Sequence, residues 1–440
     1  MGSTHIPHYK NTAGKPAVVM PSAKEVLLPL SQHIGAPATP LVAVGDEVTV
    51  GQKIADANGF VSAPIYASIS GKVTRIEDYL RPDGRTVAAI RIVSDGLMTR
   101  CERIAPPAIN DLDGLVAAAR ESGLVGLGGA GFPLSVKLEA LKKGGIDTII
   151  INGAECEPYI TCDTHAMLYE SEWIARGIAL LEKYARTVQR FIIGIEKNKP
   201  TCINKLREIF AEDDRVRVAS LPDAYPQGGE KVLIYNTTKR IIKEGKLPAD
   251  VGVLVINVTS LVILAKYVEC GEPLISRCVT LDGSAVAEPK NIIAPIGCSI
   301  RELLEFGGGL KETAGKVLYG GPMMGTTAAS LDEPIVKTTG AITILNRKDS
   351  LFSEPTACIH CGRCIRSCPL DLSPVAYSKA LECESNDEKI AILDKNKIML
   401  CMECGCCSFV CPANRPLVQN NRIAKAEYRE YQSAMAKLKK

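Results

Sequence analysis

Apolar and polar residues alternate over the first quarter of the chain. Residues 41–55 keep a period of two, and Gly45-Asp46 and Gly51-Gln52 supply turn signals within them. Residues 63–73 complete the same pattern. Alternation with regular turn residues is typical of short, half-buried strands. The sequence therefore predicts a β unit over residues 1–105.

The last of these segments resembles the barrel-sandwich fold of biotinyl and lipoyl carrier domains. Those carriers present a modifiable lysine at the tip of a hairpin. Here the corresponding stretch is Ile65-Tyr66-Ala67-Ser68, which contains no lysine. We therefore expect an unmodified domain with a structural or docking role.

Residues 106–270 follow a different pattern, in which helical spacing alternates with short runs of β-branched residues. Pro106-Pro107 marks the linker that precedes this block. Strands alternating with helices are typical of an α/β fold with a mostly parallel sheet. The predicted helices span residues 111–122, 171–186 and 201–212, and the predicted strands span residues 146–151, 190–195, 216–220 and 251–257.

The pattern changes again over residues 271–347. A hairpin is expected at Asp282-Gly283, because Asp-Gly is a favoured two-residue turn. A short helix is predicted over residues 299–306, ended by Gly307-Gly308-Gly309, and a further strand over residues 316–319. This small β–α–β unit resembles a β-grasp module.

Two cysteine runs dominate the last segment, residues 348–440. Both read C-x2-C-x2-C-x3-C-P, with a helix predicted between them over residues 374–383 and a Lys-rich surface helix over residues 422–440. A bacterial ferredoxin with two [4Fe-4S] cubanes has this spacing, and each run gives three thiolates to one cluster and a fourth to the other. One cluster is expected to take Cys358, Cys361, Cys364 and Cys411, and the other Cys401, Cys404, Cys407 and Cys368.

A ninth cysteine, Cys406, lies inside the second run without changing its spacing. We interpret it as a bystander thiol, because the gap from Cys407 to Cys411 matches the gap from Cys364 to Cys368. Zinc is the alternative metal, since C-x2-C pairs also build zinc sites. A zinc site has no use for the third cysteine and the Cys-Pro step, so the pattern favours iron–sulfur clusters.

Composition limits the class of protein. The chain has 440 residues, a net charge of +3 and 17 cysteines, and ten of the cysteines follow residue 357. The length predicts several domains, and the balanced charge gives no case for a nucleic-acid partner. Clustered cysteines in a long chain favour metal ligation over a disulfide scaffold. Residues 1–10 are not expected to form a signal peptide, and residues 251–265 are too short and too polar to span a bilayer.

A glycine-rich loop follows the first helix of the α/β block. It contains G-x-G-x-x-G at Gly126, Gly128 and Gly131. A Rossmann fingerprint must follow a strand, and here a helix precedes the loop, so the dinucleotide-binding interpretation fails on context. Glycines still let backbone N–H groups approach an anion, and Lys137 adds positive charge at the next helix start. We expect a phosphate-bearing cofactor here, with a tight inter-helix turn as the alternative.

Three further motifs carry polar side chains, and two of them lie at predicted strand ends, where α/β proteins place ligands. Glu155 and Glu157 come shortly after the first strand, and could accept ribose or amide hydrogen bonds or form a solvated pair. Residues 225–231 combine glycines with a tyrosine and a glutamate. Asn257 ends another strand, followed by Thr259, and an asparagine there can hydrogen-bond the edge of a planar ring.

Two of these stretches, Gly128–Pro133 with Lys137 and Asn152-x-x-Glu155-x-Glu157-Pro158, resemble the flavoprotein of respiratory complex I. The order of barrel, flavin block, β-grasp module and two cluster runs resembles the RnfC family, a component of the Rnf ion-translocating NAD–ferredoxin oxidoreductase complex. That family implies non-covalent FMN, NAD(H) as substrate and two [4Fe-4S] clusters. It implies cofactor contacts at Gly126, Gly128, Gly129, Ala130, Gly131, Phe132, Lys137, Asn152, Tyr225, Gly228, Asn257 and Thr259. It places Glu155, Glu157 and Glu230 where NADH stacks on the flavin.

The resemblance also implies partners and a location. The partners would be a ferredoxin-binding iron–sulfur subunit and integral membrane subunits, and the chain would lie peripherally on the cytoplasmic face of the membrane. Two alternatives stay open. One is a cobalamin reductase of diol utilisation, which shares the flavin loop and cluster runs but begins with the flavin block. The other is a non-catalytic iron–sulfur relay or scaffold that has lost nucleotide binding.

Overall fold

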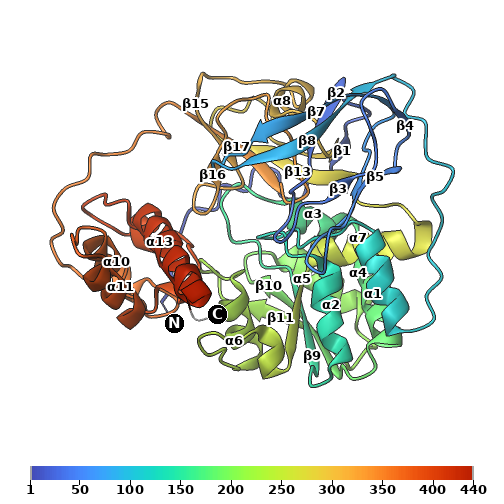
Figure 1. Cartoon of the computed structure of the whole chain (residues 1–440). Coiled ribbons are helices and arrows are strands. Elements are labelled where there is room, and N and C mark those ends of the chain that lie inside the picture. Colours follow the sequence, from blue (N-terminus) through green and yellow to red (C-terminus); the bar gives the residue numbers. More distant parts are fainter. Residues whose placement is uncertain (1, 439–440) are drawn as a thin grey trace.

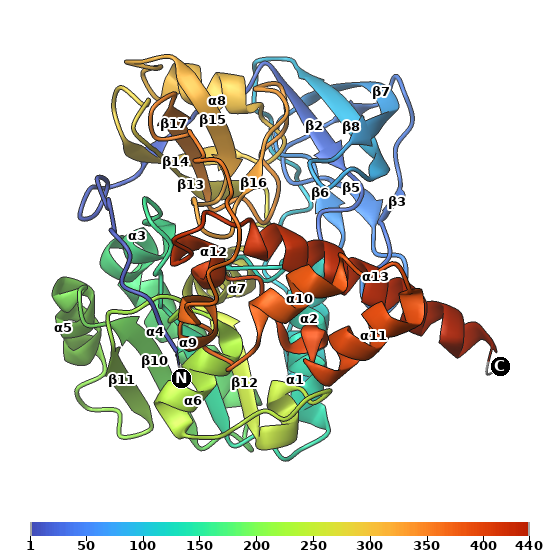
Figure 2. The same cartoon turned by 90° about the vertical axis from the view of Figure 1, so that its left-hand side faces the viewer.

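The structure is a computed structural model that describes residues 2–438. Figure 1 shows a β-rich half above an α/β block, with the C-terminal helices packed beside both. In Figure 2 the same helices, in red, lie across the face of the α/β block next to α6. The two cysteine runs are therefore carried on a unit that sits against the rest of the chain rather than apart from it.

The N-terminal unit consists of two small antiparallel sheets packed on a shared apolar core. Its buried residues include Val26, Leu28 and Ile90, together with Ile54 and Val73 from the alternating pattern. The first sheet contains β2 (Glu25–Pro29), β8 (Thr86–Ser94), β7 (Gly71–Leu80) and β4 (Glu47–Val48), and the second β3 (Thr39–Pro40), β5 (Lys53–Asp56) and β6 (Ile65–Tyr66). The predicted β unit is confirmed over residues 25–94, whereas β1 (Val18–Val19), which also lies inside the predicted bounds, belongs to the sheet of another unit.

The stretch that replaces the carrier lysine faces inward. Tyr66, at the end of β6, donates its hydroxyl hydrogen to the carbonyl of Glu121 in the α/β block. Ser68 donates to the carbonyl of Ile296 at 2.5 Å. These contacts show the stretch packed against the two neighbouring units of the same chain.

The α/β block is built on a parallel sheet with the order β11-β10-β9-β12. Successive strand residues face opposite sides, so Ile150 and Ile192 pack on one helix, α6, while Ile149, Ile151 and Ile193 pack on the others. The strands are β9 (Thr148–Asn152), β10 (Arg190–Glu196), β11 (Val216–Leu221) and β12 (Val253–Asn257). The helices are α1 (Leu112–Glu121), α2 (Leu134–Lys142), α3 (Cys162–Tyr169), α4 (Ser171–Tyr184), α5 (Pro200–Ile209), α6 (Glu230–Thr238) and α7 (Val258–Cys270), with a short 3-10 turn η1 (Pro248–Val251). The predicted mostly parallel sheet is confirmed.

The third unit is a mixed sheet with the order β1-β14-β13-β17-β15-β16. The predicted two-residue hairpin at Asp282-Gly283 is wrong, because β13 and β14 pair only after an excursion through residues 283–289. In that excursion Ala285 N donates to Ile344 O at 3.0 Å, so the chain first continues beside residues 341–346 and reverses only afterwards. The elements are β1 (Val18–Val19), β13 (Ser276–Asp282), β14 (Lys290–Pro295), α8 (Ile300–Phe306), β15 (Ala314–Tyr319), β16 (Thr326–Thr327) and β17 (Ala341–Asn346).

The C-terminal unit is helical and has its own small core around Tyr377, Leu393, Ile398 and Ala424. Its elements are α9 (Arg363–Arg366), α10 (Pro374–Ala380), α11 (Asn386–Lys395), η2 (Ile398–Leu400), α12 (Cys406–Phe409) and α13 (Leu417–Leu438). The predicted last helix begins earlier than expected, at Leu417, and its final two predicted residues lie outside the described residues.

Between residues 2 and 438, no helix combines the length and the apolar character needed to cross a membrane.

Candidate functional site

Two asparagines at the carboxyl ends of neighbouring strands lie side by side. β9 and β12 pair in parallel with Asn152 opposite Asn257. Asn152 Nδ2 donates to Gly228 O at 3.1 Å, and its Oδ1 accepts from Ala154 N at 3.0 Å. Asn257 is the N-cap of α7 and accepts from Ser260 N at 3.1 Å. The strand ends thus form one polar edge, as the sequence predicts for a parallel sheet.

The glycine loop lies directly against this edge. A Cβ on Gly128 would lie 2.6 Å from Asn257 Nδ2, so the close approach requires glycine. A Cβ on Gly129 would meet open space, and Gly129 and Ala130 are exposed at the loop tip. Gly131 has a φ of +71°, a left-handed conformation that favours glycine. The loop therefore offers exposed backbone next to Asn257.

The base of the loop is fixed by hydrogen bonds. Gly126 N donates to Phe132 O at 2.8 Å and closes the turn. Leu127 N donates to Ser260 Oγ at 3.1 Å and ties the loop to the first turn of α7. A fixed base with an exposed tip holds the backbone N–H groups in position before any ligand binds.

Lys137 lies in the first turn of α2, below the loop. Its Nζ donates to Val255 O at 3.0 Å and lies 3.4 Å from Glu230 Oε1. Glu230 is the first residue of α6, and its side chain is 44% exposed. The structure thus brings two of the predicted site residues together as a surface ion pair beside the strand ends.

Glu155 does not point toward open space. Its carboxylate is buried and accepts hydrogen bonds from Asp163 N at 2.7 Å, Thr164 N at 3.1 Å and Thr164 Oγ1 at 2.6 Å. These donors belong to the first turn of α3, so the carboxylate caps that helix. Burial raises the pKa of Glu155, and the nearby charge of Lys10 opposes that rise. These contacts give Glu155 a structural role, since they fix the loop that follows β9 to the first turn of α3.

Asp163 connects α3 to the strand edge. It accepts from Asn257 Nδ2 at 2.8 Å and from Thr259 Oγ1 at 2.5 Å. The predicted contact residues Asn257 and Thr259 are therefore held by one buried carboxylate. Asp163 belongs to no motif that the sequence reveals, because its role arises from contacts with residues about 95 positions away.

Glu157 is similarly engaged. Its Oε1 accepts from Met323 N at 2.7 Å and from Met324 N at 3.0 Å, across to the β-grasp unit. Burial raises the pKa of Glu157, while those two backbone donors oppose the rise. A Cβ on Gly321 would lie 2.3 Å from the Glu157 side chain, so the two segments pack closely. Glu157 joins the loop after β9 to another unit of the chain.

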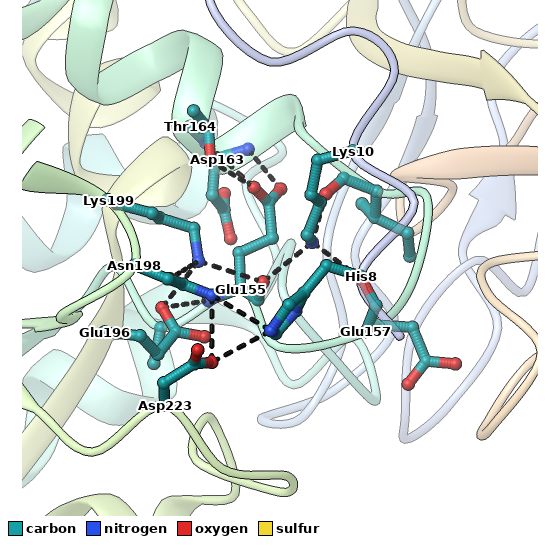
Figure 3. Close-up of polar contacts among 12 residues, drawn as sticks. His8, Lys10, Glu155, Glu157, Asp163, Thr164, Glu196, Asn198, Lys199 and Asp223 are labelled. Carbon is teal, nitrogen blue, oxygen red and sulfur yellow. Dashed lines mark hydrogen bonds and ion pairs between the residues drawn. The ribbon is translucent and has the colours of Figure 1, made fainter. Parts of the chain in front are cut away.

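A buried polar network lies beneath the loop that follows β9 (Figure 3). Lys10 Nζ donates to the carbonyls of Glu155 at 2.8 Å, Glu157 at 2.7 Å and Ile160 at 2.6 Å. Burial lowers the pKa of Lys10, and the Glu155 charge opposes that shift. The ammonium of a residue near the N-terminus therefore satisfies three carbonyls of the central loop.

The second lysine of this network is Lys199. Its Nζ donates to Glu196 Oε2 at 2.8 Å and to Glu155 O at 3.2 Å. Burial lowers the pKa of Lys199, but the Glu196 and Glu155 charges outweigh it and leave the pKa raised. Glu196 ends β10, so the strand-end signal that selected Asn152 could also have found this pair.

Tyr225 contacts the cysteines. Its side chain is buried, and its hydroxyl donates to Cys404 O at 2.7 Å. Cys404 and Cys406 pack in one apolar cluster with Tyr225, and a Cβ on Gly229 would lie 2.0 Å from the Met402 side chain. The loop from Tyr225 to Glu230 therefore contacts the second cysteine run through Tyr225 and Gly229, and the strand edge through Gly228.

The cysteines surround two hollows in the C-terminal unit. Each hollow is lined by four of the predicted cluster ligands, three from one run and one from the other. One is lined by Cys358, Cys361, Cys364 and Cys411, and the other by Cys401, Cys404, Cys407 and Cys368. Over residues 2–438 no three such side chains converge closely enough to ligate a single ion.

The two hollows differ in their surroundings. The side chains of Cys401, Cys404 and Cys407 are buried, whereas Cys361 is exposed beside the exposed Ile359. The hollow of the second run therefore lies inside the protein next to Tyr225, and that of the first run opens to the surface. Cys406 also lines the inner hollow, and its thiol lies 3.8 Å from Tyr225 O.

Three family models match consecutive parts of the chain. Residues 1–97 match the RnfC barrel sandwich hybrid domain, residues 119–266 the Nuo51 FMN-binding domain, and residues 278–327 the SLBB domain. Their order reproduces the order of the three units that precede the C-terminal helices.

Curated relatives match most of the chain. The chain is 43% identical over 373 residues to the C subunit of the proton-translocating ferredoxin:NAD(+) oxidoreductase complex of Clostridium ljungdahlii, a match that covers 84% of this chain and 81% of the relative. It is 40% identical over 430 residues to the C subunit of the Na(+)-translocating ferredoxin:NAD(+) oxidoreductase complex of Acetobacterium woodii, covering 97% and 96%. The C subunit of the ion-translocating oxidoreductase complex of Rhodobacter capsulatus is 37% identical, covering 94% and 80%.

Among solved structures, the NAD+-reducing [NiFe]-hydrogenase in the air-oxidized state matches with a TM-score of 0.51 at 19% identity, covering 71% of this chain and 60% of that chain. The same enzyme in the H2-reduced state matches with a TM-score of 0.50 at 18% identity, covering 72% and 63%. At that identity the likeness concerns the fold. The curated relatives decide the family: the chain belongs to the RnfC family, the C subunits of ion-translocating ferredoxin:NAD(+) oxidoreductase complexes.

Proposed function

We propose that this chain carries electrons between NAD(H) and two iron–sulfur clusters through FMN, as the RnfC component of a membrane-bound, ion-translocating ferredoxin:NAD+ oxidoreductase complex. One observation carries the proposal: the loop from Tyr225 to Glu230 contacts both candidate sites. Tyr225 donates to Cys404 O, and Gly228 O accepts from Asn152 at the strand edge. A single short segment thus connects the proposed nucleotide site to a proposed cluster.

The residues at the strand edge fit FMN. The exposed glycine loop would present backbone N–H groups to a phosphate, and Lys137, which reaches Val255 O at the end of β12, would supply positive charge. Asn152 and Asn257 would offer amide groups to the edge of the flavin ring, with Asp163 orienting Asn257. When bound, the flavin accepts two electrons as a hydride and releases them singly, which NAD(H) and the clusters require.

The three glutamates divide by exposure. The carboxylates of Glu155 and Glu157 accept hydrogen bonds from backbone N–H groups. We therefore assign both residues to shaping the loop beside which the nucleotide would bind. Glu230 is exposed and free to turn from Lys137 toward a bound nicotinamide nucleotide. We call residues 225–230 the connecting loop. Glu230 lies at the end of this loop and begins α6.

The cysteines fit two [4Fe-4S] clusters in a ferredoxin-like arrangement. Each hollow has four thiols, contributed three and one by the two runs, which is the cross-ligation that this spacing produces. Asn421 Nδ2 donates toward Cys401 Sγ at 3.6 Å and Cys407 Sγ at 3.8 Å, and hydrogen bonds to sulfur tune a cluster's potential.

The proposed partners are those of the relatives, whose names describe subunits of an ion-translocating complex. This chain would bind integral membrane subunits and an iron–sulfur subunit that meets ferredoxin, and it would lie peripherally on the cytoplasmic face. The outward-facing hollow of the first run is the natural exit toward such a partner, since Cys361 is exposed there.

An anaerobic titration of the reconstituted protein with NADH tests the proposal. About eight iron atoms per chain are expected from two cubanes, together with FMN released by acid. NADH should bleach the flavin spectrum and produce the EPR signals of reduced clusters. Bound zinc without acid-labile sulfide would contradict the cluster assignment, and a flavin that NADH does not bleach would contradict the nucleotide assignment.

A Lys137→Ala variant tests the phosphate site. A charge-assisted hydrogen bond contributes about 1.5–3 kcal/mol, so FMN affinity should fall by about tenfold to a hundredfold. Lys142→Ala is the matched control, because Lys142 ends the same helix and pairs with Asp113 and Glu139 on the surface. Equal FMN retention in both variants, measured by flavin fluorescence after gel filtration, would remove Lys137 from the site.

A further inference from the structure

The C-terminal unit is joined to the rest of the chain by an open linker. Residues 351–357 are all exposed and contain neither helix nor strand, as the orange trace in Figure 1 shows. Such a linker does not fix the distance between the units it joins. The position of the C-terminal unit must therefore be set by non-covalent contacts with the rest of the chain.

A segment from the opposite end of the sequence supplies such contacts. We call residues 4–12 the N-terminal strap. In Figure 2 it descends as a blue trace from the β-rich half, past α3, to the end marked N beside α6 and α9. Its upper end is anchored where Asn11 Nδ2 donates to Asp282 Oδ1 at 2.9 Å and Thr12 Oγ1 bonds with Thr161 Oγ1.

The middle of the strap holds the loop that follows β9. Lys10 satisfies three of its carbonyls, as Figure 3 shows, and Tyr9 stacks on Tyr159 with ring centroids 5.1 Å apart. His8 Nε2 lies 3.0 Å from Oδ1 of Asp223, a residue that precedes the connecting loop. The buried Lys10 is costly to desolvate, and three carbonyl partners offset that cost only if the strap is in place.

The lower end of the strap reaches the second cysteine run. Thr4 and Tyr225 exchange two backbone hydrogen bonds of 2.9 Å each. Ile6 is buried in one apolar cluster with Tyr225, Cys404 and Cys406. The strap therefore forms an isolated antiparallel bridge with the segment that connects the strand edge to the inner hollow.

We propose that the N-terminal strap is a positioning element. It holds the second cysteine run, and the cluster proposed there, against the connecting loop and the loop that follows β9, and so sets the rate of electron transfer between flavin and cluster. Lys10 and Ile6 are its two positioning residues. The inference rests on the proposed function for the identity of the transferred electrons. The clamp itself rests on the contacts of Lys10, Thr4 and Ile6. The sequence pattern of the first ten residues contains no sign of this role.

The test uses the full-length, cofactor-loaded protein. Ile6→Ala removes the packing against Cys404 without touching the glycine loop, and Val19→Ala, at an exposed position of β1, is its matched control. On anaerobic rapid mixing with NADH, the flavin of Ile6→Ala should be bleached at a rate within about twofold of the wild-type rate. Its clusters should be reduced at least about tenfold more slowly, because a misplacement of about 1 Å strongly lowers the rate of a reaction between positioned groups. Val19→Ala should match the wild type in both phases.

A second readout does not depend on cofactor activity. Hydrogen exchange of the backbone amides in residues 225–230 and 401–411 should be faster in Ile6→Ala, and in Lys10→Met faster in residues 155–160 as well, relative to Val19→Ala and to Lys15→Met. Lys15 is an exposed lysine just beyond the strap and controls for the loss of charge. If Lys10→Met does not fold, the Ile6→Ala data decide.

Two results would overturn the strap. One is equal slowing of flavin bleaching and cluster reduction in Ile6→Ala, and the other is unchanged exchange in residues 401–411 of that variant. A wild-type protein whose flavin NADH does not bleach would instead refute the proposed function, and the exchange data would still decide whether the strap clamps the unit.

Discussion

The contact between Gly128 and Asn257 gives the sharpest test of where the flavin binds. Replacing Gly128 by Ala puts a methyl group 2.6 Å from Asn257 Nδ2, 3.1 Å from its Cγ and 3.3 Å from its Cβ. All three distances are shorter than ordinary van der Waals contact, so Asn257 must turn away. Asn257 is not free to do so, because it caps α7 and donates to Asp163.

The cost can be estimated from the bonds that would be lost. Loss of an N-cap costs about 1 kcal/mol, and a hydrogen bond to a carboxylate contributes about 1.5–3 kcal/mol. Partial relaxation of the loop reduces the sum, so the free energy of unfolding should fall by about 1–3 kcal/mol, as for other overpacked sites. If Asn257 contacts the flavin ring, its displacement should also weaken FMN binding about tenfold, which corresponds to about 1.4 kcal/mol.

The neighbouring glycine supplies the control. A methyl group on Gly129 meets open space, and neither glycine has the positive φ that would strain an alanine. Gly129→Ala should therefore keep the stability of the wild type, or gain slightly from a less flexible unfolded chain. FMN affinity by fluorescence titration of the apoprotein, and urea unfolding midpoints, measure both effects. Unchanged FMN affinity in Gly128→Ala would refute the placement of the flavin beside Asn257.

Two further predictions concern other parts of the chain. Burial lowers the pKa of Lys337 to about 7, whereas an unfolded lysine keeps a pKa of about 10.4. Between those values only the unfolded chain holds the proton, so the free energy of unfolding should rise with pH by about 1.4 kcal/mol per unit. Lys337→Met should remove that slope in urea titrations at pH 7, 8 and 9, and an unchanged slope would contradict the assignment. Cys407→Ala should lose about four of the eight iron atoms of two cubanes while Cys406→Ala keeps them all, and the reverse pattern would shift the ligand assignment by one residue.

The sequence predicted those features that follow from local spacing or from the rules of a parallel sheet. The strands β9 and β12 were expected, and the rule that their carboxyl ends meet at one edge was enough to bring Asn152 and Asn257 together. The cysteine spacing predicted which thiols would line the same hollow, because in a two-cubane ferredoxin each run of this spacing gives three cysteines to one site and one to the other. In both cases the order and spacing of residues along the chain were enough to predict which side chains lie together.

The sequence could not predict contacts that depend on distant partners. The Asp282-Gly283 turn signal was locally correct in chemistry, but it took no account of β17, beside which residue 285 pairs. Glu155 looked like a ligand because it follows a strand, and only the packing of α3 showed that its carboxylate faces a helix end. Lys10 joins carbonyls about 150 positions away, and nothing in its own neighbourhood marks it.

These contacts also explain how one strand edge can support both proposed cofactor sites. The edge of the parallel sheet ends in Asn152, Glu196 and Asn257, and each is held by a different segment. Asn257 meets the glycine loop, Asn152 meets the connecting loop, and Glu196 meets the lysine network that supports the loop after β9. The two proposed sites thus share the carboxyl edge of one parallel sheet. The C-terminal unit also meets the third unit, where Arg422 donates to Met324 O at 3.2 Å. The connecting loop, however, contacts both the strand edge and the second cysteine run. A mutation in the strap that pairs with Tyr225 should therefore change how the two proposed sites are coupled while each unit keeps its own core.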